Sequence, residues 1–120
     1  MVENKVMITD NKLVVVPQGL KKLFAVKDRL EIPLENISGA TIDEGILNES
    51  RGIKAPGTSM PGYYAGTFHK DGEKTFFNIK RSSTPVVIQL QHEEYTRLVI
   101  GVEDARMLVN KINNTLETQA

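Results

Sequence analysis

Residues 98–116 read LVIGVEDARMLVNKINNTL, and the spacing of their apolar residues changes part-way along. Leu98, Ile100 and Val102 alternate with other residues, which is typical of a half-buried strand. Asp104 then occupies a position that favours the N-cap of a helix. The apolar residues that follow recur every three or four positions, which is the period of a helix: Ala105, Leu108, Val109, Ile112 and Leu116. We therefore predict a strand followed by one amphipathic helix, at about 103–116, whose apolar stripe must be buried against the rest of the chain.

Upstream of this helix the apolar residues follow a period of two, which predicts short strands between about residues 5 and 102. In the clearest run, from residue 30 to 35, Pro33 cannot donate a hydrogen bond to a neighbouring strand. That strand should therefore end at Pro33 or lie at a sheet edge. The apolar phase slips by one position between Ile37 and Ala40, and Gly39 lies at the slip, so we predict a β-bulge there.

Turn residues separate the predicted strands. Asp10-Asn11 and Asp71-Gly72 are pairs that tolerate the positive φ angles of tight hairpins. Gln18-Gly19 predicts a further turn, followed by a short strand at 23–26. The chain is therefore expected to be mainly β, with about seven strands and one C-terminal helix, and its length suits a single domain over residues 1–120.

Composition excludes several classes of function. The 15 Lys and Arg residues balance 15 Asp and Glu residues, which argues against nucleic-acid binding through a basic face. The absence of cysteine excludes disulfides, thiolate nucleophiles and cysteine-ligated zinc. The sequence shows no signal-peptide pattern and no apolar run long enough to span a membrane, so we expect a cytoplasmic location.

No group of residues predicts catalysis or a bound cofactor. His69 and His92 lie beside predicted turns without a standard metal-ligand spacing. Ser59, the one serine loosely grouped with His69 and Asp71, lacks a nucleophile elbow. We therefore expect no catalytic, cofactor-binding or metal-binding residues and no enzyme activity.

The stretch GIKAPGTSMPGYYAG at 52–66 belongs to a connection, residues 44–62, that has no sustained apolar period. Its two Pro-Gly pairs, at 56–57 and 61–62, suit type II turns and predict a loop of defined shape. Residues near these turns are of types enriched in protein interfaces: Arg51, Lys54, Met60, Tyr63 and Tyr64. The alternative is that the glycines serve only the turns and that Tyr64 belongs to the core.

Four segments resemble the small bacterial pleckstrin-homology (PH)-like domains: EIPLENI at 31–37, GIKAPGTSMPGYYAGTF at 52–68, PVVIQL at 85–90 and YTRLVIGVED at 95–104. The resemblance implies a two-sheet β sandwich or barrel capped by a C-terminal helix, and a binding role toward lipids, phosphopeptides or proteins. Lipid-binding relatives carry a Lys and Arg cluster around the first hairpin, whereas ITDNKLVV here offers only Lys12 beside Asp10. This difference argues against specific phosphoinositide binding.

Three hypotheses for function stay open at this point. The first is a non-enzymatic protein-interaction module that uses the 52–64 loop to contact an unidentified protein. The second is weak association with anionic membranes through a basic patch made of Lys21, Lys22, Lys27 and Arg29. The third is self-association into an oligomer through exposed strand edges.

Overall fold

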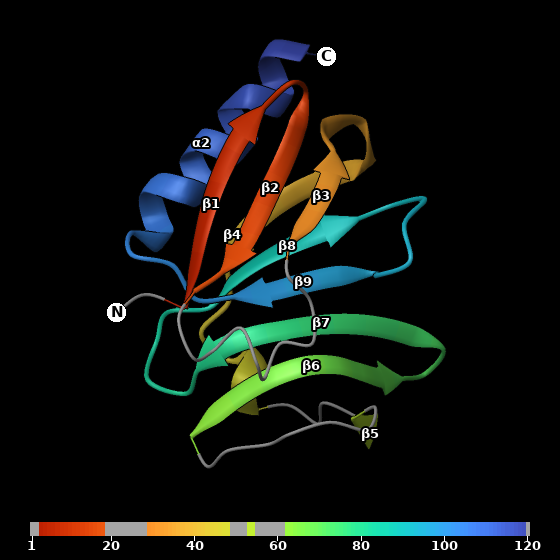
Figure 1. The fold of residues 1–120 in the computed structure, drawn as a ribbon, viewed down its shortest axis with the longest axis vertical. Helices are drawn as coiled ribbons and strands as arrows, with labels where there is room; N and C mark the ends of the chain where they lie inside the picture. The colour runs from red at the N-terminus through yellow and green to blue at the C-terminus, as the bar shows by residue number, and fades with distance from the viewer. Residues whose placement is uncertain (1–2, 19–28, 49–52, 55–61, 120) are drawn as a thin grey trace.

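The computed structural model describes residues 3–18, 29–48, 53–54 and 62–119, which form nine strands, two short 3-10 helices and one α-helix (Figure 1). The strands are β1 (Asn4–Thr9), β2 (Lys12–Pro17), β3 (Leu30–Pro33), β4 (Ile37–Ile42), β5 (Ile53–Lys54), β6 (Tyr63–Lys70), β7 (Glu73–Lys80), β8 (Val86–Leu90) and β9 (Arg97–Ile100). The helices are η1 (Leu34–Asn36), η2 (Ile46–Asn48) and α2 (Ala105–Gln119). The predicted turn at 18–19 and the predicted strand at 23–26 involve residues outside the described ranges.

The first sheet is an antiparallel meander in the order β1-β2-β3. Asp10 and Asn11 connect β1 to β2 with φ angles of 51° and 61°, which confirms the predicted hairpin. The strand predicted to end at Pro33 is β3, which ends at that residue and also forms one edge of the sheet. Both consequences expected of a proline without an N–H group are therefore present.

The second sheet has the order β4-β8-β9-β7-β6-β5, and its pairs are antiparallel except for the parallel pair β7 and β9. Ile37 pairs with Leu90 and Gly39 with Gln89, so Ser38 is the extra residue of a bulge at the predicted place. The Asp71-Gly72 hairpin is also confirmed, with φ angles of 53° and 80°.

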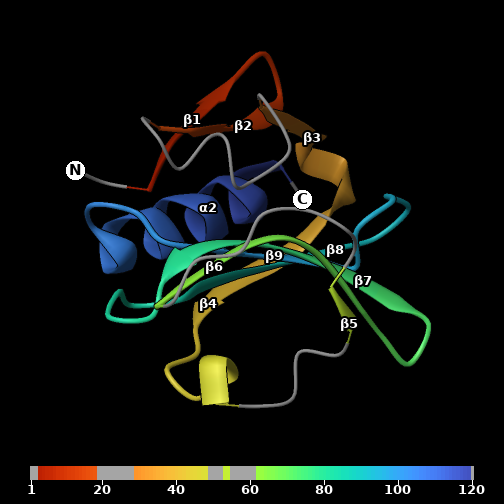
Figure 2. The same cartoon turned by 60° about the horizontal axis from the view of Figure 1, so that its bottom comes forward.

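Helix α2 lies between the two sheets, with the three-stranded sheet on one side and the six-stranded sheet on the other (Figure 2). Asp104 is its N-cap, because the Met107 N–H donates to Asp104 Oδ1 at 3.0 Å. Val109 and Ile112 are fully buried, and the rest of the predicted stripe packs around them. The helix continues to Gln119, three residues beyond its predicted end at 116.

Apolar side chains cover both faces of the six-stranded sheet. The larger core cluster lies between this sheet, α2 and the three-stranded sheet, and it includes Phe76, Leu98 and Ile112. A second cluster, which includes Phe77, Val99 and Leu47 of η2, occupies the opposite face, which is the side of the sheet on which Figure 2 shows η2. Neighbouring residues of β7 and β9 therefore enter different cores, which explains why these strands are apolar at consecutive positions.

The two sheets do not form a closed barrel. Within the described part of the chain, β1 and β3 are the edges of one sheet, and β4 and β5 are the edges of the other. Of the two architectures expected from the sequence, a sandwich or a barrel, the structure shows the sandwich. The open edges matter for function, because an unpaired edge can accept another strand.

Candidate functional site

A groove of about 580 Å³ lies between β1 and the first half of α2. Its walls come from three segments: Asn4, Lys5, Val6 and Met7 of β1, then Val102, Glu103 and Asp104, then Met107, Leu108 and Lys111 of α2. Met7 is 46% exposed and Met107 is 64% exposed, and no other large hydrophobic side chain in the described ranges is exposed. Two segments from opposite ends of the sequence therefore bring these two methionines to one groove.

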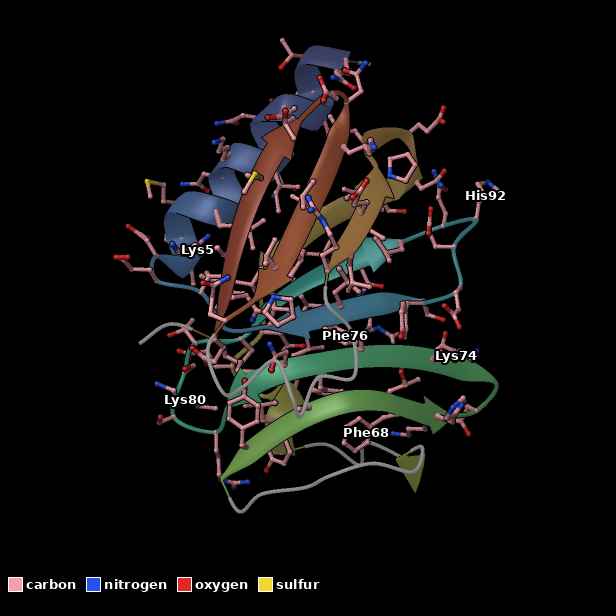
Figure 3. All side chains as sticks on the ribbon, in the orientation of Figure 1. Lys5, Phe68, Lys74, Phe76, Lys80 and His92 are labelled. Carbon is pink, nitrogen blue, oxygen red and sulfur yellow. The ribbon has the colours of Figure 1, made fainter. Side chains whose placement is uncertain are left out.

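Charged side chains lie around this apolar surface. Figure 3 shows Lys5 on β1 near the first turn of α2, which is the end of the groove where Glu103 and Asp104 lie. Lys111 lies farther along α2, about 10 Å from Asp104 at 1.5 Å of rise per residue. Neither lysine forms an ion pair with a described residue. The groove therefore combines an apolar centre with charges of both signs.

The residues predicted from the 52–64 loop are only partly visible. Arg51 and Met60 lie outside the described residues, as does the first Pro-Gly pair. The backbone of Lys54 belongs to β5, which pairs with Phe68 and His69 of β6. Gly62 has a φ angle of 75°, as the third position of a type II turn requires. The structure therefore places part of this connection as a two-residue strand along β6.

The two adjacent tyrosines face opposite sides of β6. Tyr63 is only 6% exposed, and its hydroxyl donates a hydrogen bond to Asn78 Oδ1. Tyr64 is half-buried, its ring packs edge-on against Phe77, and its hydroxyl accepts a hydrogen bond from Arg81 at 2.6 Å. Tyr63 therefore has little surface to offer a partner, whereas Tyr64 keeps a partly exposed side chain.

Tyr63 belongs to a buried polar network that joins the start of β1 to the six-stranded sheet. Asn78 Nδ2 donates to Asn4 Oδ1 at 2.7 Å, and Asn4 Nδ2 donates to the carbonyl oxygens of Asn78 and Gly101 at 2.9 and 2.8 Å. Asn4 and Asn78 are 2% and 0% exposed. Because their amides satisfy one another and the backbone, the network costs little to bury and fixes the position of β1.

Glu3 extends this network beyond β1. Its Oε2 accepts hydrogen bonds from the Lys80 N–H at 2.9 Å and from the Ser83 hydroxyl at 2.6 Å. A Cβ atom at Gly101 would lie 2.0 Å from the same oxygen, so only glycine leaves room for this carboxylate. The start of β1, and with it one wall of the groove, is therefore held by contacts to β7 and to the chain after β9.

Of the four residues of the predicted basic patch, only Arg29 is among the described residues. Lys21, Lys22 and Lys27 lie outside the described residues. Arg29 Nε is 3.2 Å from Glu31 Oε2, and Lys12 Nζ is 2.9 Å from Glu31 Oε1. The hydrogen bond and the charge of Lys12, with a smaller effect of Arg29, lower the pKa of the Glu31 carboxyl. The charge of Arg29 is therefore partly neutralised by Glu31.

The histidines considered for catalysis or metal binding lie on separate elements of the structure. His69 and His92 are both exposed, on β6 and in the turn after β8, and Ser59 lies outside the described residues. The described residues bring no three histidine, cysteine, aspartate or glutamate side chains together as a metal site would. Among the same residues, no helix is both long and apolar enough to cross a membrane.

The sequence analysis missed the groove. Met7 occupies a solvent-facing position in the alternation of β1, and Met107 lies beside the apolar stripe of α2. An apolar residue on a predicted polar face was the available signal at both positions. That the two methionines share one surface depends on how β1 and α2 are placed in the fold.

A sandwich of two sheets with a helix packed between them, and with a groove between β1 and α2, defines a small domain of the PH-like type. Residues 5–116 match the family described as Bacterial PH domain, and the chain belongs to this family. Comparisons with curated proteins and with solved structures returned no match. Domains of this kind are generally non-enzymatic and serve as interaction modules for proteins or lipids.

Proposed function

We propose that residues 1–120 form one non-enzymatic PH-like domain that binds a protein partner through the groove between β1 and α2. The observation that carries this proposal is that Met7 and Met107, the two exposed large hydrophobic side chains of the described chain, line the same groove. Single exposed apolar residues are common on protein surfaces, but apolar residues gathered in a groove with a polar rim mark interaction sites. Methionine side chains adapt easily to the shape of a partner.

The charges around the groove favour a protein over an anionic membrane. Lys5 and Lys111 are accompanied by Glu103 and Asp104, so this surface has no net excess of positive charge. Attraction to anionic lipid depends on clusters of lysine and arginine, each of which contributes about 1 kcal/mol near the membrane surface. Membrane contact through the Lys21 to Arg29 patch stays a second proposal, and steep dependence on salt concentration would support it.

We propose the 52–64 loop as a second contact surface, without the buried Tyr63. Arg51, Lys54, Met60 and Tyr64 keep their proposed roles there. Figure 1 shows β5 and β6 at the far edge of the six-stranded sheet, away from β1 and α2. Because Tyr64 packs in the second cluster, on the face of the six-stranded sheet opposite to α2, an experiment that reports the position of a contact can separate it from the groove.

Site-specific photo-crosslinking in the native cells tests the proposal. A benzophenone amino acid would replace Met107 in the groove, Tyr64 beside the loop, or His92 in an exposed turn as a control (Figure 3). We expect a discrete protein adduct from position 107 and none from position 92. Protein adducts from position 64 alone would move the contact surface to the loop, and lipid adducts alone at position 107 would contradict protein binding.

A further inference from the structure

Two of the four sheet edges in the described part of the chain, those of β3 and β4, are protected against the addition of another strand. The β3 edge contains Pro33 and carries the ion pairs of Glu31. Prolines and charges are established ways to block an edge. Of the β5 edge only Ile53 and Lys54 are described, because residues 49–52 and 55–61 lie outside the described ranges.

Helix α2 protects the second of these edges, that of β4. Asn113 Nδ2 donates to the Ala40 carbonyl at 2.9 Å, and Asn113 Oδ1 accepts from the Ala40 N–H at 3.0 Å. The side-chain amide thus forms the two hydrogen bonds that a residue of a neighbouring strand would form. The bulge at Ser38 disturbs the same edge further.

The β1 edge contains no proline and is not covered by a described side chain as β4 is, and Lys5 is its one charged residue. The two-residue hairpin makes Thr9 and Lys12 a hydrogen-bonded pair, so alternate residues of β1 bond to β2 and the residues between them face away. Val6 and Ile8 therefore direct their backbone N–H and C=O groups away from β2. These groups have no hydrogen-bond partner among the described residues.

The unprotected part of β1 opens into the groove. Val6 and Met7 form one wall, and Met107, Leu108 and Lys111 of α2 form the other. Figures 1 and 2 show β1 and α2 running in the same general direction on this side of the molecule. A strand added to β1 would therefore place every second side chain against α2.

We infer that β1 accepts an extended segment of the partner protein as an additional antiparallel strand, which deepens the proposed function and rests on it. Met107 and Lys111 lie four residues apart on α2, or about 6 Å along the helix, and Glu103 precedes the helix at its N-terminal end. Side chains on one face of a strand recur about every 6.6 Å, so two of them match Met107 and Lys111, and the next one points toward the end of the groove where Glu103 lies.

The charges of the groove define the side chains of this segment. An antiparallel segment begins near Lys111 and ends near Glu103, because β1 and α2 point the same way. Its sequence should therefore be an acidic residue, any residue, an apolar residue, any residue and a basic residue. Lys5 also lies at the Glu103 end, but the two carboxylates of Glu103 and Asp104 outweigh its single charge.

Selection from a displayed library of random nine-residue peptides on the full 120-residue chain tests this inference. We expect the acidic-apolar-basic pattern with two-residue spacing among the enriched peptides. Met107→Glu should weaken binding of the best peptide at least tenfold, whereas Arg106→Glu, at an exposed neighbour that does not line the groove, should change it less than threefold. Lys111→Glu should exchange the preference for an acidic first residue for a basic one.

Backbone methylation identifies strand addition specifically. Each amide nitrogen of the best peptide would be methylated in turn, and we expect at least tenfold weaker binding at every second position and little change between them. Binders with a helical period of three to four residues, or binders insensitive to methylation, would overturn the inference. So would a failure to enrich any peptide over the Met107→Glu variant.

The two proposals fail in different ways. A protein crosslinked from position 107, together with peptides that bind without using their backbone amides, would leave protein binding in the groove and remove strand addition. If sedimentation shows a dimer that Met7→Glu dissociates, the occupant of the β1 edge is a second copy of this chain, and the inferred partner segment is wrong.

Discussion

Tyr63 and Tyr64 are adjacent in sequence but belong to different environments. Alternation along β6 predicts that the two side chains point to opposite faces, yet it does not say which one is buried. Asn4 and Asn78 decide this, because their buried amides provide the hydrogen-bonding environment in which the Tyr63 hydroxyl is placed. The interface role of Tyr63 could not be judged from the sequence for that reason.

Replacing Tyr63 by phenylalanine should reveal this burial through the pH dependence of stability. Burial, and secondarily the charge of Glu3, raise the pKa of Tyr63 above its ordinary value of 10.0. Above pH 10 the unfolded chain therefore releases this proton more readily than the folded chain, so the free energy of unfolding falls as pH rises. At pH 7 the free energy of unfolding of Tyr63→Phe should be about 1–3 kcal/mol lower than that of the wild type, because Asn78 Oδ1 loses a donor. Between pH 7 and about pH 11 the free energy of unfolding of Tyr63→Phe should fall by less than that of the wild type.

Urea unfolding at a series of pH values measures both effects. The comparison between the two proteins isolates Tyr63, because all other titrating groups are shared. Curves that stay parallel from pH 7 to about pH 11 would mean that the Tyr63 hydroxyl is not held in its protonated form by the fold.

Individual elements were the most predictable part of the structure. The Asp10-Asn11 and Asp71-Gly72 hairpins, the end of β3 at Pro33 and the Asp104 N-cap all depend on residues within a few positions of one another. The edge contact of Asn113 was not predictable in this way. It joins α2 to Ala40, and the sequence shows only a polar residue next to the apolar stripe.

Removing the Asn113 amide should therefore destabilise the protein through β4. Asn113→Ala leaves the N–H and C=O of Ala40 without these partners in a partly buried place, and we expect a loss of about 1–3 kcal/mol. Asn114→Ala makes the same change at the next, exposed position of the helix and should alter stability by less than about 0.7 kcal/mol.

Chemical unfolding compares the two variants, and hydrogen exchange at the Ala40 amide reports the edge directly. That amide should exchange faster in Asn113→Ala than in Asn114→Ala. Equal stability of the two variants would show that water replaces the Asn113 contact without cost.

At the scale of the whole molecule, α2 has one face in the core and one face on the groove. Ile112 is 0% exposed between the two sheets, whereas Met107 is 64% exposed. Ile112→Ala should cost about 2–5 kcal/mol, the range for removal of a buried aliphatic side chain. Met107→Ala should change stability by less than about 0.5 kcal/mol, as surface substitutions usually do.

Calorimetric unfolding of the two variants tests whether the groove is open. A large loss of stability in Met107→Ala would show that this side chain is packed in the free protein, and the groove would then be unavailable to a partner.

The sequence by itself determined the turns, the bulge, the helix and its cap, and the mainly β class, because turn, cap and periodicity rules act over a few neighbouring residues. Its resemblance to bacterial PH-like domains indicated the arrangement of sheets and helix. Only the tertiary structure decided that the sheets form a sandwich, that Asn113 covers the β4 edge and that the β1 edge opens beside Met7 and Met107. These features depend on packing between segments far apart in the chain, and no local pattern of residues specifies that packing.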